Sequence, residues 1–198
     1  MPGPEAPRIA PGGFREIGLR NAVIVKVAGL ASGGKPPNVL TTIARHRKLF
    51  RRWLRFGSAL MPGGKLPREE VELVILRVAH NTGSEYEWSQ HERIAAAVGL
   101  SGEEIARARD GAAAAGWSER RSALLAAADE LHADRRIGDE LWARLRGFLD
   151  EEELIELCML VGHYEALAMT LNSLAVELDP IPERPSLALR LLRKRRPA

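Results

Sequence analysis

Apolar residues recur every three or four positions through much of the chain, which is typical of amphipathic α-helices. The clearest pattern follows Pro67, where Val71, Val74, Ile75 and Val78 have the i, i+3, i+4, i+7 spacing of one buried helix face. After the polar break at 81–83, a second helical pattern begins at Ser84, a good N-cap, and ends at Gly99, a good C-terminal stop. Similar patterns predict helices over about 39–57 and 101–110, from Ser118, from Asp139 and over about 150–178.

Composition divides the chain into three parts. Residues 1–37 carry many Pro and Gly residues and are predicted to form an N-terminal arm, in which the apolar patch 22–30 is either one strand or a helical turn. Residues 38–180 hold the helical patterns, and residues 181–198 form a basic C-terminal tail. The sequence therefore predicts an all-α fold, with one helical domain between two extended ends.

Bulk composition indicates a soluble globular protein without disulfides. Of the 198 residues, 45% are hydrophobic and 28% charged, and a single Cys permits no internal disulfide. The first residues lack the apolar region of a secretory signal, so we expect a cytoplasmic protein. The last helix is long enough to cross a membrane, but Glu156, His163, Glu165 and Asn172 favour a core helix or a subunit interface.

Basic residues gather in two places, on one side of the helix over 39–57 and at Arg193–Arg196 in the tail. Either cluster could bind nucleic acid, and the tail could also touch anionic lipid. No nucleic-acid motif accompanies the helix cluster, so a solvated face is favoured there. A short basic cluster like that of the tail is common, and a solvated or partner-docking tail is favoured. We expect neither a nucleic-acid nor a membrane partner.

Candidate chemistry concentrates around the break between the two clearest helices. Glu72 shares a helix side with apolar residues, so burial would make it a usable proton carrier, although the residues alone favour a boundary carboxylate paired with Arg68 or Arg77. Glu87 and His91, at i and i+4, share a face and could exchange a proton near neutral pH. The structural alternatives are a capping box formed by Ser84 with Glu87 and a core role for His91.

The spacing from Glu72 to Ser84, followed by Tyr86-Glu87-Trp88-Ser89-Gln90-His91, resembles the carboxymuconolactone decarboxylase and alkylhydroperoxidase D superfamily. The similarity spans most of residues 38–180 and includes Gly99, the stretch 131–134 and the stretch 161–164. It implies an alkylhydroperoxidase D-like helical domain that assembles as trimers or hexamers. In the peroxidase branch, a Cys-x-x-Cys pair occupies the positions of Ser84 and Glu87, beside a relay glutamate at the position of Glu72 and a histidine at that of His91.

The absence of both thiols counts against a thiol peroxidase, because a serine without a strong base is a poor nucleophile and forms no disulfide. The resemblance instead favours the decarboxylase-like branch, an acid–base enzyme on a small organic acid or lactone. Glu87 and His91 would move protons, Glu72 would tune or relay them, and Tyr86 would donate a hydrogen bond to a developing oxyanion. The alternatives are hydroperoxide reduction and a non-catalytic oligomeric binding protein. The sequence suggests no cofactor and no metal ligand set; the expected partners are a small-molecule substrate and further copies of the chain.

Overall fold

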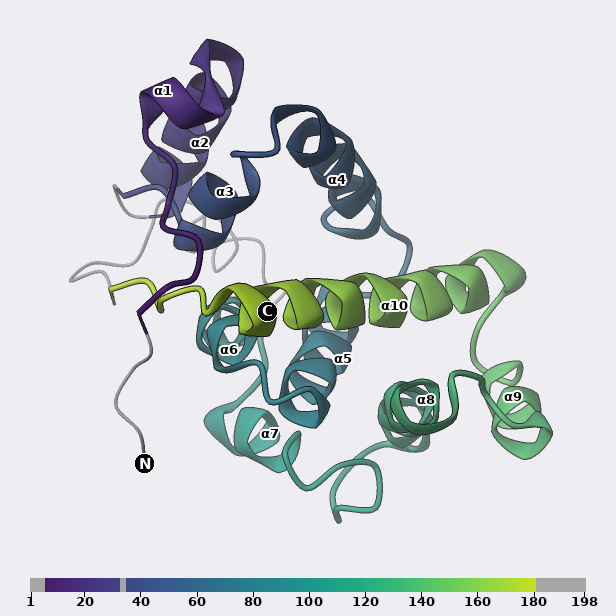
Figure 1. The fold of residues 1–198 in the computed structure, drawn as a ribbon. Helices are drawn as coiled ribbons and strands as arrows, with labels where there is room; N and C mark the ends of the chain where they lie inside the picture. Colours follow the sequence, from purple (N-terminus) through teal and green to yellow (C-terminus); the bar gives the residue numbers. More distant parts are fainter. Residues whose placement is uncertain (1–5, 33–34, 181–198) are drawn as a thin grey trace. The chain divides into compact units, whose positions relative to one another are not determined.

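The computed structural model describes residues 6–32 and 35–180, and every regular element in these ranges is an α-helix (Figure 1). The predicted all-α class is therefore confirmed. The helices form two compact units. The terminal unit contains the described residues up to Ser58 and from Thr170 onward, and the central unit runs from Ala59 to Met169.

The terminal unit is built from α1 (Phe14–Ile17), α2 (Leu19–Ser32), α3 (Asn38–Ile43) and most of α4 (Arg47–Leu60). The apolar patch 22–30, left open between a strand and a helical turn, lies within α2. The predicted boundaries of the arm and the helical domain stay predictions, and the basic tail 181–198 lies outside the described residues. The small core of this unit consists of Ile17, Val25, Ala44 and Phe50.

The single helix predicted over about 39–57 is wrong, because the chain turns between α3 and α4. The buried Asn21 amide donates to the carbonyl oxygens of Ala44 (3.3 Å) and Arg47 (3.4 Å). The amides of Arg45 and His46 bond three residues back, as in a tight 3₁₀ turn. Hydrogen bonds from the Asn21 side chain thus stabilise the turn between α3 and α4. The local spacing of apolar residues cannot predict such bonds.

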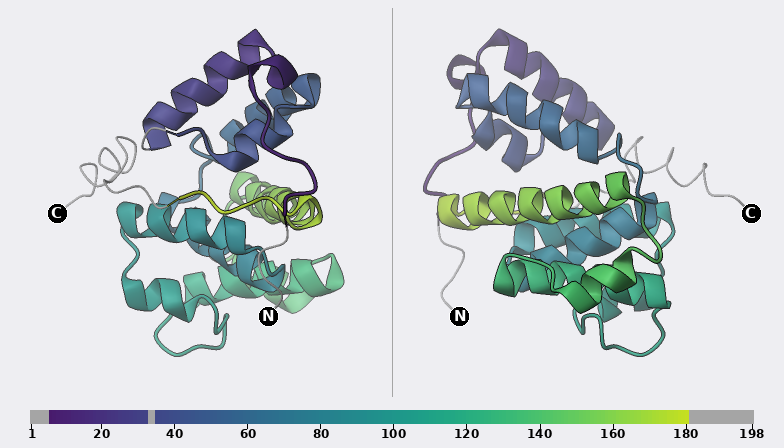
Figure 2. Two further views of the ribbon diagram at one scale, coloured as in Figure 1. Left: turned by 60° about the vertical axis from the view of Figure 1, so that its left-hand side comes forward. Right: turned by 90° about the vertical axis from the view of Figure 1, so that its right-hand side faces the viewer.

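The central unit contains the end of α4 and most of α10 (Glu151–Leu174), with five helices between them (Figures 1 and 2). Helix α5 packs against both α6 and α8. The main core is formed by apolar residues of α5, α8, α9 and α10, and a second cluster joins α5, α6 and Leu125 of α8. The five helices are α5 (Arg68–Asn81), α6 (Glu85–Val98), α7 (Gly102–Arg107), α8 (Glu119–Asp134) and α9 (Asp139–Leu145).

Several predicted helix ends are confirmed by hydrogen bonds. Ser101 and Glu104 form a capping box at α7, and Asp150 and Glu153 exchange the equivalent bonds at α10. Gly138, not Asp139, is the N-cap of α9, and α10 ends at Leu174 rather than near residue 178. Within the described ranges, α10 is the one helix long and apolar enough to span a membrane; half of its most apolar segment is buried, as expected for a core helix.

Arg120 on α8 ties two other parts of the central unit together. Its guanidinium bonds both carboxylate oxygens of Glu70 on α5 (2.9–3.1 Å) and the carbonyl of Phe148 (2.6 Å). Arg120→Met should cost about 3–5 kcal/mol in urea denaturation, because the buried Glu70 carboxylate would lose its cation. The neighbouring Arg121, paired with Glu104 at the partly exposed edge, is the matched control: Arg121→Met should cost about 1 kcal/mol or less. Equal losses of unfolding free energy in Arg120→Met and Arg121→Met would contradict the stabilising role given to Arg120.

Candidate functional site

A tight turn places the candidate residues of α5 and α6 beside one another. The amide of Ser84 donates to the carbonyl of Ala79 (2.8 Å), and Gly83 adopts a positive φ of 61°, a conformation that glycine adopts at little cost. The two helices therefore run back along each other, with the inward face of α6 against α5. This arrangement brings Glu72, near the start of α5, next to His91 in the second turn of α6.

Glu72 is fully buried and interacts with two basic side chains. Its Oε2 lies 2.7 Å from Nδ1 of His91, and its Oε1 lies 2.6 Å from Nη2 of Arg68 in an ion pair. Both interpretations of Glu72 from the sequence therefore describe part of its surroundings: it pairs with Arg68, and it also faces an imidazole. Arg68 compensates the carboxylate charge that burial would otherwise disfavour.

Glu87 does not form the capping box that its spacing from Ser84 allowed. The Ser84 amide is bonded to Ala79, and the Ser84 side chain makes no capping bond. Glu87 is instead 2% exposed, and neither carboxylate oxygen has a hydrogen-bond partner among the described residues. Burial raises the pKa of Glu87 to about 8; the charge of Glu165 adds to the rise, and the nearby Ser84 hydroxyl offsets part of it.

The structure therefore brings the candidate residues together in a different pairing from the one expected. His91 was predicted to couple to Glu87, but its Nδ1 bonds Glu72 on the neighbouring helix. Glu87 lies one turn before His91 as a buried carboxyl that its raised pKa keeps protonated at neutral pH. Tyr86 is also buried on α6, and its role as an oxyanion donor stays a prediction.

Tyr164 of α10 completes this cluster, and the sequence analysis did not single it out. Its ring meets the imidazole of His91 edge to face, with ring centroids 5.1 Å apart and planes at 88°. Its hydroxyl donates to the sulfur of Met61 at 3.6 Å, a weak acceptor. Burial, with the charge of Glu72, raises the pKa of Tyr164 well above its ordinary value. The sequence feature that could have pointed to Tyr164 is its position next to His163, in the stretch 161–164 of the family resemblance.

No cysteine thiol lies among these residues. Ser84 and Glu87 occupy the two positions where the resembling peroxidases carry cysteines, and the Ser84 side chain is buried with its Oγ unbonded. The single cysteine, Cys158, lies on α10, where burial raises the pKa of its thiol and disfavours the reactive thiolate. In residues 6–32 and 35–180, no three His, Cys, Asp or Glu side chains are grouped to hold a metal ion.

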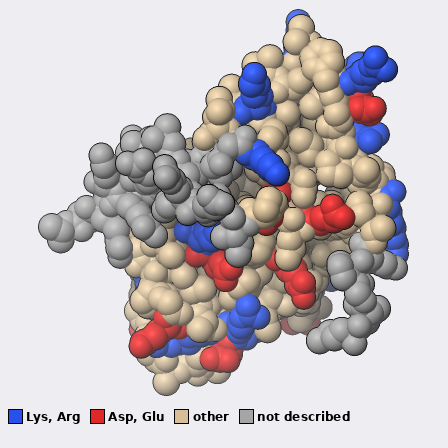
Figure 3. All heavy atoms as spheres, turned by 90° about the vertical axis from the view of Figure 1, so that its left-hand side faces the viewer, with Lys and Arg blue, Asp and Glu red and all other residues tan. Residues whose placement is uncertain are grey.

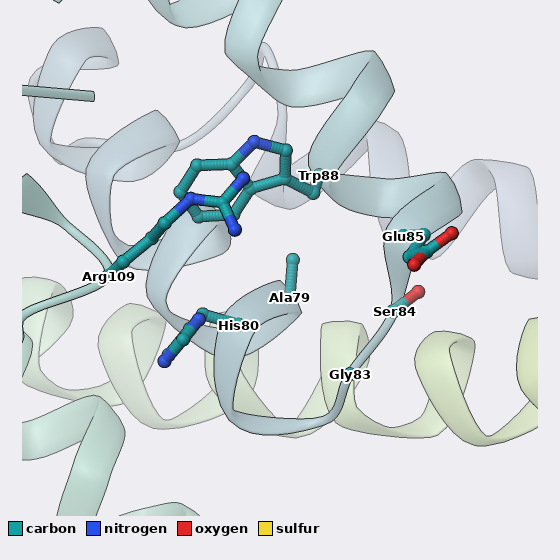
Figure 4. Close-up of a pocket in the computed structure, with 7 residues that line it drawn as sticks. All are labelled: Ala79, His80, Gly83, Ser84, Glu85, Trp88 and Arg109. Carbon is teal, nitrogen blue, oxygen red and sulfur yellow. The ribbon is translucent and has the colours of Figure 1, made fainter. Parts of the chain in front are cut away.

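A surface pocket of about 420 Å³ opens on the other side of the α5–α6 turn (Figure 4). Of the cluster residues described above, only Ser84 lines it. The remaining walls come from the end of α5, the start of α6 and Arg109, whose guanidinium lies 3.8 Å from the centroid of the Trp88 ring. Acidic and basic side chains are interspersed on the face shown in Figure 3, so this face carries no large patch of one sign.

Comparisons with known proteins agree with this architecture. Residues 47–130 match the family model described as the carboxymuconolactone decarboxylase family. No curated protein matches the chain.

Similar solved structures share the fold at low sequence identity. A peroxidase-related protein with an alkylhydroperoxidase AhpD core from Ralstonia eutropha is 17% identical over 96% of this chain and 97% of its own, with a TM-score of 0.78. A peroxidase-related protein from Silicibacter sp. is 15% identical over 90% and 95%, with a TM-score of 0.77. The debrominase Bmp8 is 15% identical over 94% and 96%, with a TM-score of 0.73. At these identities the likeness is one of fold.

Proposed function

Residues 47–130 match the carboxymuconolactone decarboxylase family model, and we propose that this chain is a thiol-independent acid–base enzyme of that superfamily acting on a small organic acid or lactone. The observation that carries the proposal is the buried contact of 2.7 Å between Glu72 Oε2 and His91 Nδ1, beside the protonated Glu87. In such a site the imidazole of His91 can act as a base while the neutral carboxyl of Glu87 acts as an acid.

In the proposed chemistry, His91 is the base. An Nδ1–H donated to the Glu72 carboxylate leaves the lone pair on Nε2, which removes a proton from the carbon next to a substrate carbonyl. The electron pair of the broken C–H bond moves to the carbonyl oxygen. Glu87, as a neutral carboxyl, or the Tyr86 hydroxyl then donates a hydrogen bond to that oxygen. Return of the proton from His91 to a different carbon completes an isomerisation. In a decarboxylation no C–H bond is broken: CO₂ leaves, the electron pair of the C–CO₂⁻ bond moves to the same carbonyl oxygen, and a proton delivered through His91 to that carbon completes the reaction.

Two residues support His91 without taking or giving a proton themselves. Arg68 holds the second oxygen of Glu72, and the Tyr164 ring packs against the imidazole, so both limit how the ring can turn. A fixed ring orientation is what efficient proton transfer requires. We assign positioning roles to Arg68 and Tyr164.

Proton exchange at carbon tests the proposal directly. The full chain is incubated in D₂O with a panel of small organic acids and lactones, and ¹H NMR records the loss of C–H signals next to each carbonyl. Exchange or CO₂ release from at least one compound is the expected result. Peroxide is offered in parallel, and robust peroxide reduction that persists in Cys158→Ser would overturn the proposal. A lack of both exchange and CO₂ release across the whole panel would overturn it as well.

Assembly with further copies of the chain is part of the same proposal. On the part of α10 within the central unit, Ile155, Met159 and Met169 are 65%, 46% and 55% exposed. Burying such side chains between subunits would be favourable.

A further inference from the structure

The pocket at the α5–α6 turn contains a cation for which the described residues provide no ion pair. This cation is Arg109, whose charged group lies over the indole of Trp88, 3.8 Å from the ring centroid. A guanidinium stacked on an aromatic ring keeps its N–H groups free in its own plane, where they can bind a carboxylate with two parallel bonds. Arg109 therefore has the geometry of an anion-binding residue.

The backbone of Arg109 is held in place by a second arginine. Arg77 donates to the carbonyl oxygens of Ala108 (3.2 Å) and Arg109 (2.7 Å), and its Nε bonds Asp129 at 2.5 Å. The amide of Arg109 also donates to the carbonyl of Ala106 (3.1 Å). A side chain that starts from a fixed backbone and rests on a ring loses little freedom when a ligand binds.

The pocket around Arg109 offers an apolar surface to a ligand body. Burial and the charges of Arg77 and Arg109 lower the pKa of His80, which lines the same pocket, and Asp129 and Asp110 offset part of this shift. Figure 4 shows Arg109, Trp88 and His80 gathered around Ala79, while the carboxylate of Glu85 points away from Arg109. The Trp88 Nε1–H is already donated to Glu92 (3.1 Å), so Trp88 contributes its apolar ring.

Ser84 lines the same pocket, but its hydroxyl is buried. The side chain is 1% exposed, and the hydroxyl lies near the Glu87 carboxyl, where it offsets part of the rise in the pKa of that group. We therefore assign the charged contact with a ligand in this pocket to Arg109.

We propose that this pocket binds a small organic carboxylate with an apolar body, with the carboxylate paired to Arg109 and the body against Trp88 and Ala79. The volume of about 420 Å³ lies in the range of small-molecule sites. The binding does not depend on the Glu72–His91 contact, so the site stands whether or not the acid–base proposal holds.

Benzoate is the probe for this site, with Trp fluorescence of the full chain as the readout. Benzoate should give saturable quenching that disappears in Trp88→Phe, and the neutral isostere benzamide should bind at least about tenfold more weakly, because it lacks the charge that Arg109 pairs with. Equal binding of the two probes would overturn the proposal.

Variants of Arg109 and Arg107 test which residue binds the carboxylate of benzoate. Arg109→Gln should weaken benzoate binding by at least about tenfold, and Arg109→Lys should weaken it less, because lysine keeps the charge but not the planar pair of donors. The matched control is Arg107→Gln, which removes an arginine stacked on Trp117 (5.1 Å) outside the pocket and should leave binding unchanged. Binding that survives both Arg109 variants would show that the carboxylate sits elsewhere, such as at the start of α6, and would end the proposal.

Discussion

Glu87→Gln is expected to stabilise the protein by up to about 5 kcal/mol above pH 8 and to change its stability little near pH 4.5. In the native protein, burial raises the pKa of Glu87 from 4.5 to about 8. Between these values the native state keeps a proton that the unfolded state has released. Stability therefore falls as pH rises through this window, and it levels off above pH 8, where both states are ionised.

Glutamine has nearly the same shape as the protonated carboxyl and cannot ionise, so the variant should lack this pH dependence. Urea denaturation at pH 5, 7 and 9 measures the difference between the two proteins. Glu85→Gln, two residues earlier on the exposed side of α6, is the control and should follow the wild-type pH curve. Parallel curves for wild type and Glu87→Gln would mean that Glu87 ionises normally in the native state.

His91→Ala should lower the rate of carbon–hydrogen exchange, or of turnover on any substrate found, by at least about a hundredfold. In the proposed chemistry the imidazole is the base, and its Nδ1 is held by the Glu72 carboxylate. Glu72→Gln should cause a similar loss in kcat with a small effect on KM, because it disturbs the orientation and charge of the base rather than a substrate contact.

Another histidine of the central unit supplies the matched control. His132 on α8 bonds Glu165 through Nδ1 (2.5 Å), and Glu165 also pairs with Arg135 (3.2 Å), so this trio repeats the arrangement of Arg68, Glu72 and His91. His132→Ala should leave the rate within about threefold of wild type. Helical circular dichroism must be retained in every variant. Equal rates in His91→Ala and wild type, with the fold intact, would refute the catalytic role.

Glu87 links the two predictions. Under the proposed function, Glu87→Gln gains stability but replaces the acidic O–H donor by a weaker amide N–H donor, so its rate should fall while its resistance to urea rises. Buried, unbonded ionisable groups are destabilising, and they persist at sites where their altered pKa is useful. If Glu87→Gln is both more stable and fully active, the Glu87 carboxyl has no role in the chemistry.

Local sequence determined much of the helical framework. The i, i+3, i+4, i+7 spacing predicted α5, and Ser84 with Gly99 marked the ends of α6, because caps and periodicity depend on residues a few positions apart. The same short-range logic located Glu72 and His91 as unusual polar residues on apolar faces. It failed for α3 and α4, where the buried amide of Asn21 stabilises a turn from a distant point in the chain.

Tertiary structure alone decided which of these side chains meet. The i, i+4 spacing offered His91 a partner on its own helix, Glu87, but packing of α5 against α6 gave it Glu72 and buried Glu87 without a hydrogen bond. Packing of α10 added Tyr164, more than seventy positions from His91 along the chain. Sequence periodicity specifies the face of a helix on which a residue lies, whereas the group opposite that face depends on how separate helices pack.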